Sequence, residues 1–258
     1  MTSIAIVTGA SSGVGQAFVR QLDAGKGGPL DEIWAIARTT ERLQDLADSC
    51  HSITVRPISL DLATDSAFDE LSSLLESHEA TVQWLVNSAG YGKFGTYADI
   101  GREQNAGMVA LNCLGVVNAI SVALPHMVAG SCIVNLASIA GAVPQPELAV
   151  YSATKAFVLE LSRMLNHELA PCGIHVVAVC PKFMRTRFLD QPGNDTAANR
   201  MTLIGYNDVD DVVRKSMRCA IRGKDVCVPS IDVRLAMAAA RILPRKVLFR
   251  IEDLLFRS

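Results

Sequence analysis

Hydrophobic and polar positions alternate in blocks along the chain. Short apolar or β-branched runs predict strands at residues 4–7, 33–37, 52–58, 82–86, 132–137, 174–179 and 226–228. Between them, apolar residues recur at three- and four-residue intervals, which predicts amphipathic helices after residue 15 and over residues 40–50, 64–78, 105–127, 151–169 and 208–222. Strands alternating with helices predict an α/β fold, with a single doubly wound (Rossmann-type) parallel sheet and helices on both faces.

The whole chain is predicted to be one domain, residues 1–258, with a C-terminal helical tail from about residue 231. Part of the tail has apolar residues on one helical stripe, namely Val247, Leu248, Ile251, Leu254 and Leu255. Cations surround the stripe, namely Arg245, Lys246, Arg250 and Arg257. Either protein or a lipid surface could cover it. Protein is favoured, because Glu252 and Asp253 interrupt the cations and the tail is short.

Composition narrows the function classes. Half of the residues are hydrophobic and the formal net charge is −2, with no basic stripe for nucleic acid. No apolar run approaches the roughly 20 residues of a membrane span, and we expect no secretory signal because the first residues lack a basic n-region. The seven cysteines include no C-x-x-C pair, so we expect free thiols, no metal site and a cytoplasmic protein.

A glycine-rich turn follows the first predicted strand and opens a helix. It has the spacing T-G-x-x-x-G-x-G and comprises Thr8, Gly9, Ala10, Ser11, Ser12, Gly13, Val14 and Gly15. Glycines let backbone approach a pyrophosphate, and the free N–H groups at a helix start favour an anion. The turn therefore predicts a dinucleotide site, although an ordinary strand–helix connection has the same outline.

The end of the second predicted strand bears on cofactor choice. No Asp or Glu lies within residues 33–40, where an acidic residue would hold a ribose 2′-OH. Arg38, with Thr39 beside it, suits a 2′-phosphate instead, so NADP(H) is favoured over NAD(H) unless Arg38 is only a solvated turn charge. Asp61 and Leu62 follow the third strand, where Asp61 could reach an adenine edge.

Small and polar residues mark the next candidate positions. Asn87, Ser88, Ala89 and Gly90 end the fourth strand and allow close approach of backbone and cofactor. Asn112 lies in the middle of a predicted helix, where its propensity is unfavourable. This position indicates either a tertiary functional role or a plain core hydrogen bond.

Tyr151 and Lys155 lie four residues apart and therefore share one face of a predicted helix. An ammonium beside a phenol favours the phenolate, which would lower the phenol's pKa from about 10 towards neutrality. Such a pair suits general acid/base chemistry at a carbonyl. The same spacing also occurs by chance, with a packed Tyr and a solvated Lys.

Together, these motifs give the chain a family resemblance. Thr8–Gly15, Asn87–Gly90, Asn112, Ser138, Tyr151 with Lys155, and Pro181 followed by Thr186 occur in the order of the short-chain dehydrogenase/reductase family. Twelve residues separate Ser138 from Tyr151, as in that family. Two departures are Ser88, where the family has a second Asn, and Lys182, where it has a Gly after Pro181; the latter could alter the mouth of the pocket or its charge.

The resemblance implies a role for each matching residue. Tyr151 would exchange the proton, Lys155 would lower its pKa and hold the nicotinamide ribose, Ser138 would bind the carbonyl, and Asn112 would hold a relay water. Other residues would contact the cofactor, namely Gly9, Ser11, Ser12, Gly13, Val14, Gly15, Arg38, Thr39, Asp61, Leu62, Asn87, Ala89, Gly90, Pro181 and Thr186.

The predicted function is an NADP(H)-dependent oxidoreductase that interconverts a ketone and a secondary alcohol. We expect a lipophilic small-molecule substrate, such as an acyl, steroid or xenobiotic carbonyl, and a homodimer or homotetramer. The alternative is a dinucleotide-binding sensor or scaffold without chemistry, although an intact Ser138, Tyr151 and Lys155 argues against it.

Overall fold

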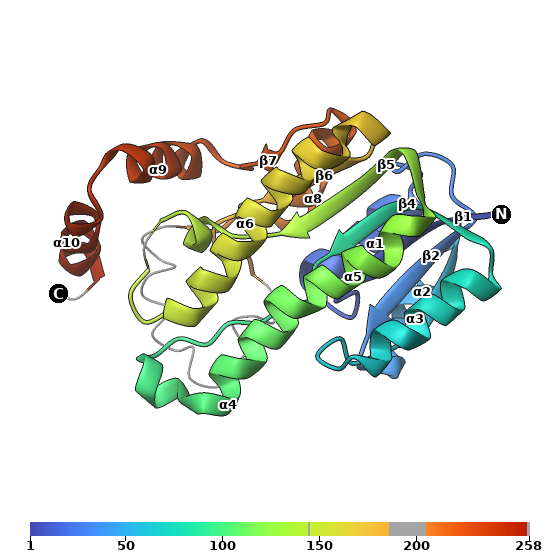
Figure 1. Cartoon of the computed structure of the whole chain (residues 1–258), viewed down its shortest axis with the longest axis horizontal. Coiled ribbons are helices and arrows are strands. Elements are labelled where there is room, and N and C mark those ends of the chain that lie inside the picture. Colours follow the sequence, from blue (N-terminus) through green and yellow to red (C-terminus); the bar gives the residue numbers. More distant parts are fainter. Residues whose placement is uncertain (144, 186–204, 257–258) are drawn as a thin grey trace.

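The computed structural model describes residues 1–143, 145–185 and 205–256. Its centre is a parallel sheet of seven strands in the order β3-β2-β1-β4-β5-β6-β7 (Figure 1). The strands are β1 (Thr2–Thr8), β2 (Glu32–Ala37), β3 (Thr54–Ser59), β4 (Ala80–Asn87), β5 (Met127–Leu136), β6 (His175–Val179) and β7 (Val226–Cys227). The predicted doubly wound parallel sheet is confirmed.

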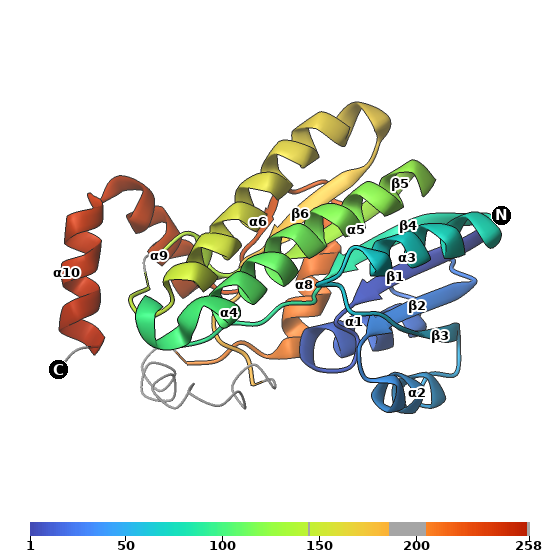
Figure 2. The same cartoon turned by 60° about the horizontal axis from the view of Figure 1, so that its bottom comes forward.

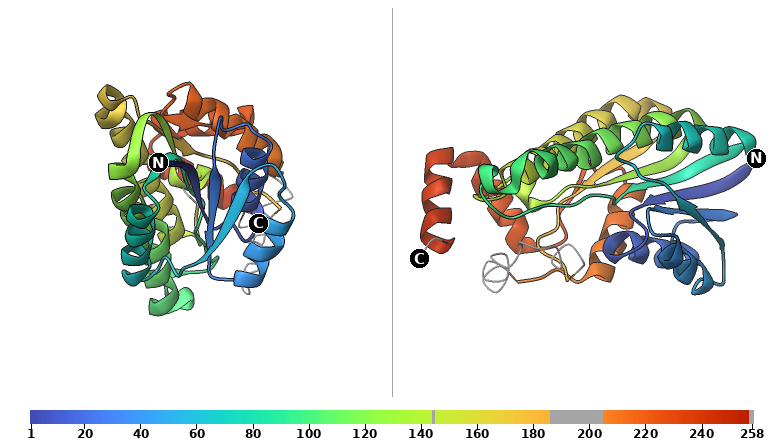
Figure 3. Two further views of the ribbon diagram at one scale, coloured as in Figure 1. Left: turned by 90° about the vertical axis from the view of Figure 1, so that its right-hand side faces the viewer. Right: turned by 90° about the horizontal axis from the view of Figure 1, so that it is seen from below.

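Helices cover both faces of this sheet (Figures 2 and 3). Alternate side chains of a strand point to opposite faces, so Ile4 and Ile6 of β1 belong to one core and Ala5 and Val7 to the other. The first core is closed by α3 (Ser66–Ser77), α5 (Gly115–Ala123) and α6 (Ala149–Leu169). The second is closed by α1 (Gly13–Asp23), α2 (Thr40–Asp48) and α8 (Val209–Ile221).

The long helical stretch before β5 begins earlier than its hydrophobic pattern predicts. It comprises α4 (Tyr97–Val109), a π turn η1 (Ala110–Leu114), α5 and a 3₁₀ turn η2 (Leu124–His126). Thr96 starts α4 by accepting a hydrogen bond at its hydroxyl from the Asp99 N–H at 3.3 Å. Gly101, at φ 78°, interrupts the helical backbone, which hides the first turn from a periodicity argument.

This same stretch bears on the expectation that no segment spans a membrane. Within the described residues, the helix over Tyr97–His126 is long and apolar enough, by length and composition alone, to cross a membrane. The expectation of no such segment rested on uninterrupted apolar runs, which polar residues such as Asn112 break up. The helix lies against the sheet, with Val116, Ala119 and Ile120 in the first core. A helix that packs on a core passes the same compositional test, and this one packs on the first core.

The chain ends in two helices, which we call the C-terminal arm: α9 (Ile231–Ile242) and α10 (Arg245–Phe256). Pro244 separates them, because proline has no N–H to continue a helix. Val233 and Met237 attach one face of α9 to the first core. The arm lies at the end of the molecule opposite the N-terminus and projects from the two helical layers (Figures 1 and 3).

Short 3₁₀ turns complete the described chain. One of them, η3 (Ile139–Gly141), follows β5 and touches α6, whereas η4 (Ala170–Cys172) follows α6. Gly141 has no room for a side chain, because an added Cβ would lie 2.6 Å from the Lys155 backbone carbonyl. This contact holds the segment after β5 against the helix of Tyr151 and Lys155.

Candidate active site

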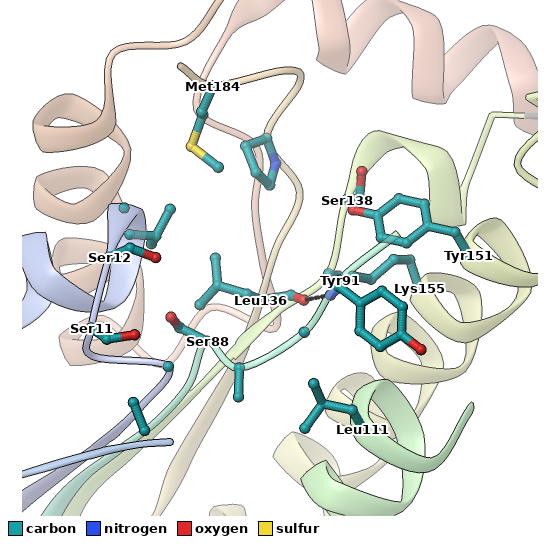
Figure 4. A pocket seen from close by; sticks show the side chains of 18 of the residues that line it. Ser11, Ser12, Ser88, Tyr91, Leu111, Leu136, Ser138, Tyr151, Lys155 and Met184 are labelled. Atoms are coloured by element: carbon teal, nitrogen blue, oxygen red, sulfur yellow. Dashed lines mark hydrogen bonds between the residues drawn. The ribbon is translucent and has the colours of Figure 1, made fainter. Parts of the chain in front are cut away.

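A cavity of about 580 Å³ opens at the carboxyl ends of the strands (Figure 4). Loops after β1, β2, β3, β4, β5 and β6 contribute to its wall, together with α6. In open parallel sheets, this edge is where ligands bind. Most of the predicted site residues line it, namely Gly9, Ser11, Ser12, Gly13, Val14, Arg38, Thr39, Asp61, Leu62, Ala89, Gly90, Ser138, Tyr151, Lys155 and Pro181.

The turn after β1 is closely packed against the end of β4. Gly9 has φ +67°, and an added Cβ would lie 2.8 Å from the Ala89 backbone. Gly15 is tighter, since its Cβ would lie 2.4 Å from the Gly9 carbonyl oxygen. The Thr8 hydroxyl accepts hydrogen bonds from the Ser88 and Ala89 N–H groups at 3.1 and 3.2 Å, which fixes the two loops together.

The start of α1 is suited to an anion. No side chain caps its N-terminus at Ser12, and its first turn contains no acidic residue. Its free N–H groups and positive dipole end therefore remain available at the cavity wall, where Gly13 and Val14 lie. These free N–H groups fit the pyrophosphate of a nicotinamide dinucleotide. Gly9 and Gly15 keep the turn in this shape, since a larger residue at either position would push the loops apart.

Two arginines line the β2 end of the cavity. Arg38 lies just after β2, and Arg42 lies in the first turn of α2. Both residues are exposed. Arg42 was missed by the sequence analysis, because its place in the first turn of the helix after β2 shows only in the structure. Asp61 is the acidic residue of this wall among those described, and its Oδ1 accepts a hydrogen bond from the Ala63 N–H at 3.1 Å.

Asn112 lies inside the π turn and is fully buried. Its Oδ1 accepts a hydrogen bond from the Tyr91 N–H at 3.0 Å, and its Nδ2 donates to the Tyr91 carbonyl at 2.9 Å. The same Nδ2 lies 3.1 Å from the Thr154 hydroxyl oxygen. Asn112 thus holds the loop after β4 against α6 through buried hydrogen bonds, as a core asparagine does, and its role in holding a relay water stays a prediction. Gly90 borders it, since an added Cβ would lie 2.8 Å from Asn112 Oδ1.

The Ser138 and Tyr151 side chains lie next to each other at one side of the cavity (Figure 4). The Ser138 hydroxyl caps η3 by accepting a hydrogen bond from the Ala140 N–H at 3.2 Å. The two side chains also share a hydrogen bond, which lowers the pKa of the Tyr151 phenol. Burial is the stronger effect and raises this pKa to about 12.

Lys155 lies beneath the tyrosine ring with its Nζ 5.7 Å from the ring centroid. Burial lowers its pKa to about 8, partly opposed by the nearby Cys113 and Cys180 thiols. Its Nζ donates a hydrogen bond to the Leu136 carbonyl at 2.6 Å. The Lys155 amine is directed at a backbone carbonyl and burial disfavours its charge, so the expected lowering of the Tyr151 pKa by Lys155 stays a prediction.

Other predicted residues lie away from the main cavity. Asn87 is buried and donates from its Nδ2 to Asn135 Oδ1 at 2.8 Å. Gly15 and Asn112 support the wall from behind and are not part of it. Thr186 lies outside the described residues.

Apolar residues that the sequence analysis did not identify form the wall beside Tyr151. Phe94 and Leu148 are buried and pack with Tyr151 and Phe183. Leu111, Ile139 and Met184 also line the cavity, together with polar Gln104 and Gln145. These residues come from the segments after β4, β5 and β6 and from the helical stretch of α4 and η1, so no local pattern could have grouped them.

Lys182 occupies the position where the resemblance expects glycine, and it lines the cavity. Its Nζ lies 2.7 Å from Asp232 Oδ2, at the first turn of α9, and its side chain is only 13% exposed. Its backbone N–H donates to Asn207 Oδ1 at 3.0 Å. The added charge at the mouth of the pocket is thus paired, and the residue ties the segment after β6 to the C-terminal arm.

The sequence of this chain matches a known protein family. The family model for short chain dehydrogenases matches residues 3–196. The chain belongs to this family. It is therefore an NAD(P)-dependent oxidoreductase acting on CH–OH groups or the corresponding carbonyls.

Individual relatives cover most of the chain. Sulfoacetaldehyde reductase 2 of Chromohalobacter salexigens is 34% identical over 209 residues, which are 77% of this chain and 80% of the relative. A short-chain dehydrogenase of Sphingobium yanoikuyae in complex with NADPH is 28% identical, with a TM-score of 0.77 over 93% of this chain and 94% of that one. The bulky-bulky ketone specific alcohol dehydrogenase of Comamonas testosteroni is 26% identical, with a TM-score of 0.74 over 93% and 92% of the two chains.

Proposed function

We propose that this short-chain dehydrogenase is an NADP(H)-dependent reductase of a lipophilic ketone, working reversibly on the secondary alcohol. The observation that carries the proposal is the meeting of Ser138, Tyr151 and Lys155 at one part of a cavity whose other part holds Arg38 and Arg42. The solved relatives in complex with NADPH and with specificity for bulky ketones support it.

The two ends of the cavity have different tasks in this proposal. The turn of Gly9 and Gly13, with the start of α1, holds the pyrophosphate, and Arg38 and Arg42 hold the 2′-phosphate. Two guanidinium groups present several donors to one dianionic group, whereas no described acidic residue of this wall lies on the β2 loop to hold a 2′-OH.

The chemistry is placed at the other end. When bound, the cofactor supplies or accepts the hydride. In reduction, the Tyr151 hydroxyl donates its proton to the carbonyl oxygen, and the Ser138 hydroxyl holds that oxygen beside it. A high pKa keeps Tyr151 protonated, which suits a proton donor. Lys155 orients the site from its hydrogen bond to the Leu136 carbonyl.

The proposed substrate class rests on the apolar wall. Leu148 and Phe183 line the cavity beside Tyr151, with buried Phe94 packed against them, and Leu111 and Met184 also line it. An apolar group on the substrate would cover this surface, and each Å² of apolar area removed from water would contribute about 25 cal/mol to binding. Gln104, Gln145 and the paired Lys182 are polar side chains of this part of the cavity, and the apolar wall beside Tyr151 favours a largely apolar ketone over a sugar.

The cofactor proposal is tested by charge reversal at the β2 end. Each charged hydrogen bond contributes about 1.5–3 kcal/mol, so Arg38→Asp is expected to weaken NADPH binding roughly 10- to 150-fold while improving NADH binding. Arg42→Ala should weaken NADPH binding less and leave NADH binding unchanged. Arg20→Ala, an exposed arginine of α1 away from the cavity, is the matched control. Equal binding of NADH and NADPH by the unaltered protein would refute the proposal.

We further propose that the C-terminal arm is covered by a second copy of the chain. Leu235, Ile242 and Leu254 are 67%, 82% and 80% exposed on it. Basic residues outnumber acidic ones in the tail, whereas the whole chain has a net charge of −2. The rest of the chain is therefore acidic, and the body of a second copy would attract the basic tail. Deletion after Leu243 should therefore reduce the mass found by light scattering or make the protein insoluble. An unchanged mass, with binding of the intact protein to anionic vesicles, would favour a lipid cover instead.

A further inference from the structure

The segment after β6 forms a continuous part of the cavity wall. Its residues Pro181, Lys182, Phe183 and Met184 all line the cavity. Phe183 and Tyr151 pack against the same buried residues, and the ring centroids of Phe183 and Phe94 are 6.3 Å apart. The position of this short segment therefore determines the shape of the apolar wall beside the proposed proton donor.

Backbone hydrogen bonds hold the segment on two sides. The Pro181 carbonyl accepts one from the Ile139 N–H at 3.0 Å. On the other side, the Lys182 N–H donates to Asn207 Oδ1 at 3.0 Å, and the Asn207 N–H donates to the Phe183 carbonyl at 2.7 Å. Neither Ile139 nor Asn207 belongs to the sheet or to a long helix, and such connecting segments open more readily than the elements they join.

A side-chain contact ties the same segment to a long helix. Lys182 Nζ donates a hydrogen bond to Asp232 Oδ2 at 2.7 Å. Asp232 lies in the first turn of α9, where the helix dipole favours a carboxylate. The hydrogen bond from Lys182 lowers the pKa of the Asp232 carboxyl, so this group stays charged at neutral pH.

The helix end of this ion pair is itself fixed. Val233, the residue after Asp232, is buried in the first core. Arg234 Nε donates a hydrogen bond to the Val228 carbonyl at 3.1 Å, which holds the start of α9 to the chain after β7. The start of α9 is thus held by the core and by the end of β7, and it can serve as an anchor for Lys182.

We propose that the Lys182–Asp232 ion pair positions the apolar wall of the cavity, so that the start of the C-terminal arm selects which ketones fit. Lys182 is a positioning residue in this proposal, because it acts on the substrate through the next two residues, Phe183 and Met184. Loss of either charge leaves the other one uncompensated and releases the wall. A bulky ketone that contacts the wall is affected more than a small one. This kinetic consequence rests on the proposed reductase function.

The kinetic test compares benzophenone, a bulky apolar ketone, with acetone. Asp232→Asn removes the carboxylate charge with little change of shape. Since misplacement by about 1 Å can cost about 100-fold, we expect the KM for benzophenone to rise roughly tenfold, with kcat for acetone and the Kd of NADPH within about twofold of the unaltered protein. Lys182→Met should give the same change, and the double variant should be no worse than either single variant. Asp232→Glu keeps the charge and should restore most of the affinity.

Asp225→Asn is the matched control. Asp225 pairs with Arg163 at 3.8 Å, and neither residue lines the cavity. The exposed fractions of these two side chains, 58% and 17%, are close to the 54% and 13% of Asp232 and Lys182. This variant should leave the KM for both ketones unchanged.

Amide hydrogen exchange tests the positioning without turnover. Asp232→Asn should speed exchange of the Lys182 and Asn207 N–H groups, which hold the segment after β6. The Ala178 N–H, which donates to the Asp225 carbonyl at 2.9 Å in the sheet, should exchange as in the unaltered protein.

Faster exchange at these two groups, together with a raised KM for benzophenone, supports the proposal. Unchanged exchange, additive effects of the two single variants, or an equal loss for both ketones would overturn it. If the unaltered protein reduces no ketone, the proposed function fails, and amide exchange then decides this inference by itself.

Discussion

Removing one oxygen atom from Tyr151 separates the catalytic role of this residue from its structural one. In Tyr151→Phe, the ring keeps its packing against Phe94, Leu148 and Phe183. The variant lacks the hydrogen bond between the Tyr151 hydroxyl and Ser138, and an ordinary hydrogen bond contributes about 0.5–1.5 kcal/mol to folding. We therefore expect the free energy of unfolding to fall by no more than about 1.5 kcal/mol, with NADPH binding retained.

The expected loss of turnover is much larger. A positioned acid contributes roughly 10²- to 10⁴-fold, equivalent to about 3–5.5 kcal/mol of transition-state stabilisation. The assay follows NADPH absorbance with a panel of bulky ketones, beside urea unfolding and a cofactor titration of the same preparation. Tyr97→Phe is the matched control, because this tyrosine is 68% exposed and lies outside the cavity. Turnover of Tyr151→Phe within tenfold of the unaltered protein would refute the role of Tyr151.

Two further results are expected from neighbouring residues. The folded pKa of Lys155 is about 8 against an ordinary 10.5, so the unfolded chain binds more protons between these values and the free energy of unfolding should rise as pH increases across this window. Urea unfolding at pH 8 and about pH 9.5 should show this rise, and Lys155→Met should flatten it; equal slopes would contradict the burial argument. Gly90→Ala should cost about 1–3 kcal/mol, because its Cβ would lie 2.8 Å from the hydrogen-bonded Asn112 side chain. An unchanged denaturation midpoint would show that Asn112 can move aside.

Periodicity was sufficient to predict the sheet. Every predicted strand is present. Strands of a parallel sheet are buried on both faces, so they show as continuous apolar runs in the sequence. For β1, predicted at residues 4–7, the structure gives Thr2–Thr8. Helix limits were less well predicted. The start of α4 depends on Thr96 and on a backbone change at Gly101, which have no hydrophobic signature.

The site was predictable where a residue acts through its own chemistry and its local spacing. Ser138, Tyr151 and Lys155 lie together as their order in the chain suggested. The burial that raises the pKa of Tyr151 was not predictable, because spacing along a helix does not say how deeply a phenol lies or which carbonyl a lysine will reach. The apolar wall, and the ion pair of Lys182 with Asp232, depend on loops that meet only in three dimensions.

The π turn at Ala110–Leu114 constrains how this protein can be recombined or redesigned. Such a turn contains one residue more than an α turn, and one residue corresponds to about 100° of rotation around a helix. Deleting a single residue there would rotate α5 relative to α4 by that angle. Either Asn112 would leave the loop after β4, or Val116 and Ala119 would leave the sheet. Chimaeras with homologues should therefore exchange α4, the turn and α5 as one cassette, with junctions before Thr96 or after His126.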